Sequence, residues 1–347
     1  MFREIDQTEA IDWRRLRDYL ATQGLAGDLG TPRQFAAGFG NWNFLLEIGG
    51  VRYVLRRPPD GPLPAGANDM AREHRILSRL HPHFPLAPAV RVFCDDPDVI
   101  GAPFLLIEHR AGVVVRSEVP PALATDFDPR AFTARAVDVL VALHKLDPAA
   151  VGLQDLGRPE GMVGRQARNW RLRAEAAFDG QLPASLREVS QWLTRPAPEP
   201  QRVSILHSDF KFDNLIVSPQ TAAPVALIDW DMGTLGDPLF DMATFLSYWA
   251  EPDDHAAMRF LQQMPTASPG FPRRAEVLAL YAERSGLDVA SFGYYRVLAL
   301  FKLCVVFRQL HQRHLRGLTQ DARVASFGPL TESLADFTAY VLANEHL

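Results

Sequence analysis

The stretch His207-Ser208-Asp209-Phe210-Lys211-Phe212-Asp213-Asn214 decides the fold that this sequence is expected to adopt. An apolar run of the kind that forms a strand precedes it, and a second apolar run ends in Ile228-Asp229-Trp230-Asp231, with Asp229 fifteen positions after Asn214. Taken singly, a buried His, a capping Asp or an Asn in a turn is commonplace. Together, in the order H-x-D-x4-N, strand, I-D-W, these residues indicate one unit that gathers carboxylate and amide groups.

These residue types at this spacing suit phosphoryl transfer. A carboxylate at Asp209 can orient and deprotonate a hydroxyl group, and Asn214, across a short turn, can reach a metal ion on a nucleotide. Asp229 follows the expected strand Val225 to Ile228 and can hold the magnesium ion that bridges the phosphates, because magnesium prefers hard oxygen ligands. The sequence therefore predicts a kinase that uses Mg²⁺ and a nucleotide; the expected nucleotide is ATP, although the sequence does not distinguish it from GTP.

The composition limits the expected partners and compartment. The chain has 347 residues, 47% of them hydrophobic, and its formal net charge of −5 gives no electrostatic reason to expect nucleic-acid binding. The two cysteines, Cys94 and Cys304, lie far apart in apolar surroundings, so neither a disulfide framework nor a cysteine-based zinc site is expected. We expect a cytoplasmic protein with a small-molecule acceptor, and the oligomeric state stays open.

No segment is expected to be exported or to cross a membrane. Met1 to Asp18 is rich in charged residues and lacks the apolar core of a secretory signal. The most apolar stretch, Val297 to Phe307, is interrupted by Lys302 and is far shorter than the roughly 20 residues that span a bilayer. This stretch is therefore expected to form a buried helix.

The first third of the chain has the pattern of a small sheet with one main helix. We expect a surface helix from Ile11 to Leu20, a hairpin turn at Gly49-Gly50, a proline-rich mobile loop from Arg57 to Gly66 and the main helix from Asp69 to Leu80. The expected strands are Phe35 to Ile48, Val51 to Leu55, Val90 to Cys94 and Pro103 to Glu108. The sheet then has about five strands.

The rest of the chain is expected to be mostly helical. Helical periods dominate from Phe132 onward and are broken by a compact strand region between Val203 and Trp230. The predicted fold class is α+β, with a nucleotide-binding lobe at residues 1–110 and a larger catalytic and substrate-binding lobe at 111–347.

Three further motifs add a family resemblance. They are Tyr53-Val-Leu-Arg56-Arg57-Pro58-Pro59, Arg165-Gln166-Ala-Arg168-Asn-Trp170 and Gly233-Thr-Leu-Gly236-Asp237-Pro238. Together with the segments His207 to Asn214 and Ile228 to Asp231, they make nearly the whole chain similar to the aminoglycoside phosphotransferase and choline kinase superfamily. This superfamily shares the protein-kinase architecture. The chain most closely resembles the phosphotransferase domains fused to, or encoded near, acyl-CoA dehydrogenases.

The resemblance implies roles for the residues of the first motif. Asp209 is expected to be the catalytic base, His207 to orient the loop, and Asn214 and Asp229 to bind the metal. Lys211 lies where protein kinases place a lysine that faces the γ-phosphate, although these relatives often carry arginine. The family usually has Gly where this sequence has Ser208, and a serine there should be tolerated unless the loop needs a positive φ angle.

The resemblance also implies a nucleotide site in the first lobe. Arg56 occupies the strand position of the phosphate-pairing lysine, and Glu73 is its expected ion-pair partner; the alternative is a solvated Arg56 and a Glu73 that pairs with Arg75. The loop Gly38-Phe-Gly40-Asn41-Trp42-Asn43 would cover the phosphates, although a simple hairpin turn is equally compatible with it. The segment from Glu108 through His109 and Arg110 to Gly112 would be the hinge that binds the adenine.

Three acidic residues are structural or ambiguous. Asp237 and Asp241 are expected to cap and anchor a helix that begins near Pro238, because Pro is favoured at the first helical position and a preceding Asp accepts backbone donors. Asp231 is expected to touch either a second metal ion or only the backbone.

Charge is the only clue to the acceptor. The segment around Trp170 carries Arg165, Arg168, Arg171 and Arg173 within an acidic protein. A basic lining favours an acceptor with phosphates or a carboxylate, such as a hydroxyacyl-CoA or a hydroxy acid. An equally good interpretation is that the arginines lie on solvated helix faces without a ligand. Trp170 is expected to fill the core rather than to stack on an acceptor ring.

Two alternatives to this function remain. The chain could phosphorylate an aminoglycoside or a choline-like amino alcohol, which predicts acidic residues around the acceptor. It could also be a catalytically silent nucleotide-binding scaffold, although Asp209, Asn214 and Asp229 are all present.

Overall fold

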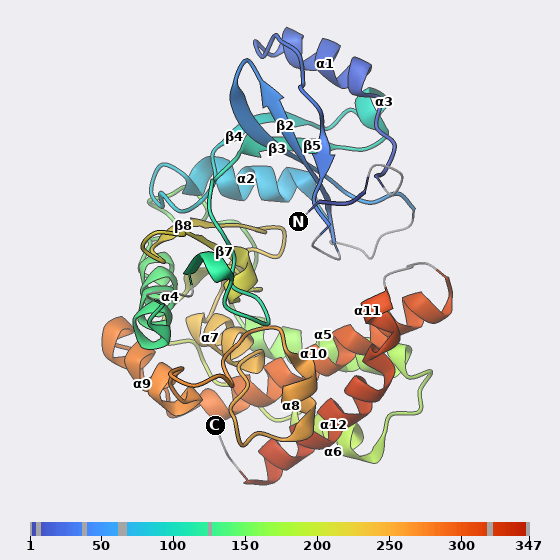
Figure 1. Ribbon diagram of the computed structural model, residues 1–347. Helices are drawn as coiled ribbons and strands as arrows, with labels where there is room; N and C mark the ends of the chain where they lie inside the picture. Colours follow the sequence, from blue (N-terminus) through green and yellow to red (C-terminus); the bar gives the residue numbers. More distant parts are fainter. Residues whose placement is uncertain are drawn as a thin grey trace. The chain divides into compact units, whose positions relative to one another are not determined.

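The computed structural model describes residues 2–4, 8–36, 40–61, 68–123, 127–317 and 322–344, without the side chains of 322 and 323. Two compact units make up the chain (Figure 1). Unit 1 comprises Met1–Gly112, Val151–Leu153 and Val225–Gly233, and unit 2 comprises Val113–Ala150, Gln154–Pro224 and Thr234–Leu347. The lobes 1–110 and 111–347 remain a prediction, and these units differ from them chiefly because the late segment Val225–Gly233 belongs with unit 1.

Unit 1 contains a five-stranded antiparallel sheet in the order β1-β2-β3-β5-β4, which confirms the predicted sheet of about five strands. Its strands are β1 (Arg33–Gln34), β2 (Trp42–Ile48), β3 (Val51–Arg57), β4 (Val90–Cys94) and β5 (Phe104–Glu108). The predicted turn joins β2 to β3, and Gly49 and Gly50 have φ angles of 60° and 79°. Glycine adopts such angles without the steric cost that a Cβ atom imposes.

The prediction of one strand from Phe35 to Ile48 is wrong. Gln34 of β1 pairs antiparallel with Phe44 of β2, so the chain must reverse direction between them. The strand β2 therefore begins only at Trp42. Residues 37–39, which include Gly38 of the predicted phosphate loop, lie outside the described residues, as do residues 62–67 of the predicted proline-rich loop.

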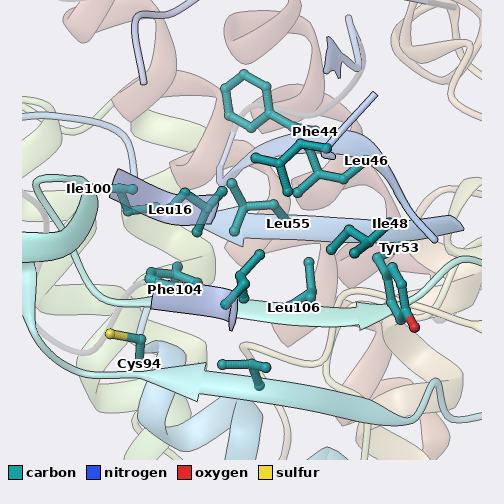
Figure 2. Close-up of a cluster of buried hydrophobic side chains, with 13 residues drawn as sticks. Leu16, Phe44, Leu46, Ile48, Tyr53, Leu55, Cys94, Ile100, Phe104 and Leu106 are labelled. Atoms are coloured by element: carbon teal, nitrogen blue, oxygen red, sulfur yellow. The ribbon is translucent and has the colours of Figure 1, made fainter. Parts of the chain in front are cut away.

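One face of the sheet builds the core of unit 1 (Figure 2). Side chains alternate between the two faces of a strand, so Phe44, Leu46 and Ile48 of β2 all point to this face. Leu16 and Leu20 of α1 (Trp13–Thr22) pack against it, together with Ile100 of α3 (Pro97–Ile100). The predicted helix from Ile11 to Leu20 thus begins two residues later, because Asp12 caps it by accepting from the Arg15 amide.

The main helix of unit 1 is α2 (Met70–Leu80), close to its predicted bounds. The predicted first residue, Asp69, is its N-cap and accepts from the Arg72 amide at 3.0 Å. The buried stripe consists of Met70, Glu73, Ile76, Leu77 and Leu80. A single glutamate, Glu73, is thus buried on an otherwise apolar face, where an unpaired charge would be costly.

Unit 2 is mostly helical, as predicted. Its helices are α4 (Pro129–His144), α5 (Met162–Ala177), α6 (Ala184–Trp192), α7 (Pro238–Ser247), α8 (Ala256–Leu261), α9 (Arg274–Ser285), α10 (Phe292–Leu315), α11 (Ala322–Ala325) and α12 (Phe327–Asn344), with short 3₁₀ turns η2 (Pro121–Leu123) and η3 (Phe212–Asn214). The long helix α10 packs against α5, α7 and α12 (Figure 1). It contains the predicted buried stretch Val297 to Phe307. Within the described part of the chain, no helix is long and apolar enough to span a membrane.

The stretch from His207 to Asn214 follows a short strand of unit 2. This strand, β6 (Ser204–Leu206), pairs with β9 (Thr234–Gly236), and β7 (Leu215–Val217) and β8 (Pro224–Leu227) follow the stretch in sequence. Phe210 and Phe212 are fully buried and meet Phe245 of α7, with ring centroids 5.2 and 5.3 Å apart. The two phenylalanines alternate with Asp209 and Lys211, so aromatic packing fixes the segment that carries these polar groups.

Replacing Phe212 with alanine should strongly destabilise unit 2. The ring is fully buried and also meets Phe132 and Trp249, with centroids 4.7 and 5.8 Å away. Loss of such a ring leaves a cavity, and Phe212→Ala should lower the free energy of unfolding by about 3–5 kcal/mol in urea denaturation. Phe260→Ala, at a side chain that is 75% exposed, is the matched control and should change it little. Equal effects of the two substitutions would contradict this packing argument.

Candidate active site

The start of the stretch from His207 to Asn214 is held by one buried carboxylate. The backbone amides of His207 and Ser208 each donate to Asp241 at 2.7 Å, and Nε2 of His144 lies 3.2 Å from the same carboxylate. Burial alone would raise the pKa of Asp241, but the interactions with His144 and His207 outweigh it and lower the pKa. Asp241 therefore stays ionised and fixes the path of the backbone.

Ser208 occupies the left-handed region of backbone conformation, with a φ angle of 67°. We expect a serine to be tolerated at this position unless the loop needs a positive φ angle. The loop does need one. Its amide is held by Asp241 and its carbonyl accepts from Nζ of Lys302 at 3.0 Å. Among the described residues its buried hydroxyl has no hydrogen-bond partner. The contacts on both sides of Ser208 impose a conformation that glycine adopts more readily.

The carboxylate of Asp209 is the centre of a polar cluster in unit 2. Nζ of Lys211 lies 2.9 Å from Oδ2, and Nδ2 of Asn214 donates to the Asp209 carbonyl at 2.8 Å and to Oδ2 at 3.2 Å. The hydroxyl of Tyr248 lies 3.4 Å from Oδ1. His207 accepts the Asp209 amide through Nδ1 at 3.3 Å. Four residues predicted for the site, His207, Asp209, Lys211 and Asn214, thus lie together.

The charge of Asp209 keeps Lys211 protonated and Tyr248 neutral. Burial by itself lowers the pKa of Lys211, but the charge of Asp209 outweighs it, so the pKa is raised. Burial raises the pKa of Tyr248, and the charge of Asp209 raises it further. The Tyr248 hydroxyl therefore stays neutral and can donate to the carboxylate, whereas Lys211 balances its charge.

A second polar cluster, in unit 1, is centred on Arg56. Its guanidinium contacts Glu73 at 3.1 Å, Asp229 at 2.7 Å and Oδ1 of Asn43 at 3.1 Å. Leu55 points to the apolar core, so alternation along β3 directs Arg56 to the opposite face of the sheet. The predicted ion pair with Glu73 is confirmed. A planar guanidinium can hold three acceptors at once, which a lysine ammonium in the same place would do less rigidly.

The two partners of Arg56 differ in exposure. Glu73 is buried, with 1% of its side chain exposed, and burial raises its pKa while Arg56 opposes the rise. Asp229 has 39% of its side chain exposed and a φ angle of 70°, so its backbone is also left-handed. The charge of Asp231 also acts on Arg56. Asp229 is thus the carboxylate of this cluster that can still meet a ligand.

The described part of the predicted phosphate loop is held by side chains. Asn68 donates to Oδ1 of Asn41 at 2.9 Å, and Asn43 donates to the Asn41 carbonyl at 3.2 Å. The guanidinium of Arg57 lies over the Trp42 ring, 4.8 Å from its centroid. Gly40 precedes these residues and its φ angle is not positive. A phosphate-binding role for residues 40–43 remains a prediction.

The predicted hinge also has internal partners. The amides of Glu108 and His109 donate to the carbonyls of Ala89 and Arg52 at 2.9 and 3.3 Å, and Arg110 forms an ion pair with Glu108. Burial lowers the pKa of His109, as does the nearby Arg52. If the adenine of a nucleotide binds this segment, it must therefore use backbone groups other than these two amides.

The predicted acceptor residues of α5 separate into two kinds. Trp170 is 5% exposed and its Nε1 donates to Gln166 at 3.1 Å, so its favoured interpretation as a core residue is confirmed. Arg165 and Arg168 instead line a cavity in unit 2.

Asp237 caps α7 as predicted, since it accepts the Leu239 amide at 2.9 Å. The carboxylate of Asp241 instead binds the loop that begins at His207, and not the end of α7.

Sequence reasoning missed three residues around the loop, namely Tyr248, Lys302 and His144. A signal existed for Lys302, because it interrupts an otherwise apolar stretch and a lysine in a buried helix needs a polar partner. Burial lowers the pKa of Lys302, opposed by the charges of Asp209 and Asp241. Tyr248 and His144 lie far from the loop in sequence, and no local pattern marks them.

Ser208→Gly should stabilise the protein. A residue with a Cβ atom in the left-handed region costs about 1–2 kcal/mol, and the greater freedom of glycine in the unfolded chain returns about 0.5–1 kcal/mol of this. The free energy of unfolding should therefore rise by about 0.5–1 kcal/mol in urea denaturation. Ser208→Ala keeps the strain and removes only the hydroxyl, so it should stabilise less. A destabilising glycine would refute strain at this position.

Comparison with known proteins agrees with this geometry. The phosphotransferase enzyme family model matches residues 31–277. Acyl-CoA dehydrogenase family member 10 of Mus musculus is 30% identical over 340 residues, covering 96% of this chain and 31% of that protein. Acyl-CoA dehydrogenase family member 11 of Gallus gallus is 29% identical over 351 residues, covering 96% of this chain and 44% of that protein. The chain thus spans less than half the length of these relatives.

A solved structure gives the same result for the fold. The crystal structure of a Ralstonia eutropha protein, provisionally described as an aminoglycoside phosphotransferase, superimposes with a TM-score of 0.73. The two chains are 25% identical, and the match covers 95% of this chain and 98% of the other. The family model, the relatives and the protein-kinase-like fold agree. The chain belongs to the phosphotransferase enzyme family.

Proposed function

We propose that this protein is an ATP- and Mg²⁺-dependent kinase that phosphorylates a hydroxyl group of a small anionic metabolite, such as a hydroxyacyl-CoA or a hydroxy acid. The observation that carries the kinase assignment is the cluster around Asp209. One carboxylate is fixed there by Asn214 and Lys211, on a loop whose backbone is held by Asp241. Family membership supports the same chemistry.

Asp209 acts as the base in this proposal. Its Oδ2 accepts from Lys211 and Asn214, which leaves Oδ1, with the long contact to Tyr248, as the oxygen that accepts the proton of the acceptor hydroxyl. Lys211 stays charged and neutralises charge that develops during transfer. His207 holds the Asp209 amide and so positions the base.

Asn214 and Asp229 are the proposed magnesium ligands. Nδ2 of Asn214 donates to Asp209, so its amide oxygen is the atom that can bind a cation. Asp229 is partly exposed and engages Arg56 through Oδ1. Both groups supply the hard oxygen atoms that magnesium prefers, so they fit the ion. Bound magnesium would neutralise charge on the nucleotide phosphates.

The Arg56 cluster is the proposed nucleotide-binding element of unit 1. Glu73 and Asn43 fix the guanidinium of Arg56, whose side chain is 6% exposed, so that its orientation is set before a phosphate approaches. Residues 40–43 and the segment from Glu108 to Arg110 would complete the binding of phosphates and base. The proposed donor is ATP.

Local charge supports an anionic acceptor. At the loop that carries Asp209, the lysines Lys211 and Lys302 are offset by nearby carboxylates, so the support comes from α5, where Arg165, Arg168 and Arg171 line one cavity. These arginines would repel a polycationic aminoglycoside and attract a carboxylate or phosphate. The names of the two acyl-CoA dehydrogenase relatives add support for an acyl-CoA type of acceptor.

Asp209→Asn should abolish most of the activity. The variant cannot accept the hydroxyl proton, so kcat for magnesium-dependent ADP release should fall by about 100-fold to 10,000-fold while the KM for ATP changes little. The assay uses a panel of hydroxyacyl-CoAs, hydroxy acids, amino alcohols and aminoglycosides, with and without EDTA. Chelation of magnesium should stop turnover with every acceptor.

Asp138→Asn is the matched control, because Asp138 is an exposed carboxylate of unit 2 that pairs with Arg284. It should keep wild-type kinetics. Undiminished turnover by Asp209→Asn would overturn the base assignment. Turnover with cationic acceptors alone would favour an amino alcohol kinase, and no turnover in the whole panel would favour a silent nucleotide-binding scaffold.

A further inference from the structure

Four arginines surround one cavity in unit 2. The cavity has a volume of about 550 Å³ and lies between the first turns of α5 and the segment that follows α6. Arg165, Arg168 and Arg171 come from α5, and Arg195 comes from the other wall. Its volume is within the range of about 300–1,000 Å³ that is usual for small-molecule sites.

This arrangement differs from an ordinary solvated helix face. Residues three apart share one side of a helix, so α5 alone presents three positive charges in a row. Arg195 adds a fourth from a segment remote in sequence. None of the four forms an ion pair with a carboxylate in the described part of the chain, and no acidic residue lines the cavity.

Some other arginines of unit 2, by contrast, are neutralised by carboxylates. Arg274 pairs with Asp254 at 2.5 Å, Arg130 pairs with Glu276 at 2.8 Å, and Arg284 pairs with Asp138. Four converging cations without such partners repel one another, in a chain whose net charge is −5. An anionic ligand would remove that repulsion.

Several of the guanidinium groups are held in place by the protein. Arg165 donates to the carbonyls of Arg158 and Glu160, Arg171 donates through Nε to Ser190 at 3.1 Å, and Arg195 lies over the Trp192 ring. A guanidinium has five N–H donors, so these contacts leave donors for a ligand. Groups that are already ordered lose less entropy when a ligand binds.

The helix adds to the positive potential. Gly161 and Gly164, at the N-terminal end of α5, line the same cavity. This helix has 16 residues, and no side chain caps its first turn. The positive end of its dipole therefore adds to the four arginines.

We propose that this four-arginine cavity binds the diphosphate group of a small molecule. Fork-shaped guanidinium groups match phosphate oxygens better than single carboxylates, and four of them suit more than one phosphate. In the kinase proposed above, on which this second step rests, the bound group is the phosphorylated end of the acceptor. The cavity would then select acceptors that carry a diphosphate.

Binding is measured first, by calorimetry with inorganic pyrophosphate in the presence of saturating magnesium and a non-hydrolysable ATP analogue, which occupies the nucleotide site. The double variant Arg168→Ala/Arg195→Ala should bind pyrophosphate about 100-fold more weakly, about tenfold for each charge-assisted contact. Arg187→Ala removes an exposed arginine of α6 that does not line the cavity, so it should bind like wild type. Citrate tests carboxylate binding, and added salt should weaken the pyrophosphate complex.

The outcomes distinguish failure of the cavity proposal from failure of the proposed kinase function. Equal pyrophosphate binding by wild type and the double variant, or tighter binding of citrate, would overturn the cavity proposal. Asp209→Asn should bind pyrophosphate normally even though it transfers phosphate far more slowly. If the second step is right, the double variant raises the KM at least tenfold for a hydroxyacyl-CoA and leaves that for a phosphate-free hydroxy acid unchanged. Loss of binding with no change in either KM would overturn the second step alone.

Discussion

The loop that carries Asp209 depends on one buried carboxylate. Asp241 accepts the amides of His207 and Ser208 and also lies against His144, and these contacts keep it ionised in spite of its burial. With Lys302 on the Ser208 carbonyl, they hold the backbone in a left-handed turn. The turn sends the side chains after it in alternate directions, phenylalanines into the core and charged groups into the polar cluster. Removing the Asp241 charge would therefore disturb both the packing of the phenylalanines and the position of the charged groups.

Arg56 has a similar effect in unit 1. A buried arginine needs compensation for lost hydration, and Glu73, Asp229 and Asn43 supply it. The same contacts draw the late segment Val225–Gly233 into unit 1, where Arg72 also donates to the Gly233 carbonyl at 3.1 Å and Phe84 packs against Trp230. The cluster thus has a structural consequence whatever ligand it binds. It ties a strand, a helix and a distant segment to one cation.

The four-arginine cavity illustrates a limit of sequence reasoning. The sequence contains Arg165, Arg168 and Arg171 at helical spacing, and this pattern left a ligand site and a solvated face as equal alternatives. Arg195 begins the proline-rich stretch that runs to Pro200, and only the packing of that stretch beside α5 places the fourth charge. Trp170, in the same motif, is turned into the core, so residues of one motif do not share one role.

The sequence by itself determined the α+β fold class, a sheet of about five strands with its Gly49-Gly50 turn, the helix α2 and the family, but not the division of Phe35 to Ile48 between two elements. These features rest on local periodicity, on turn chemistry and on spacings within one segment. It also paired Arg56 with Glu73, through the family resemblance. Only the tertiary structure decided that Asp241 holds the loop, that Ser208 is left-handed, that Tyr248 and Lys302 join the loop, and that four arginines share one cavity. These contacts join residues far apart in sequence, and their partners are chosen by packing and by the need to satisfy buried charges, which no local pattern encodes.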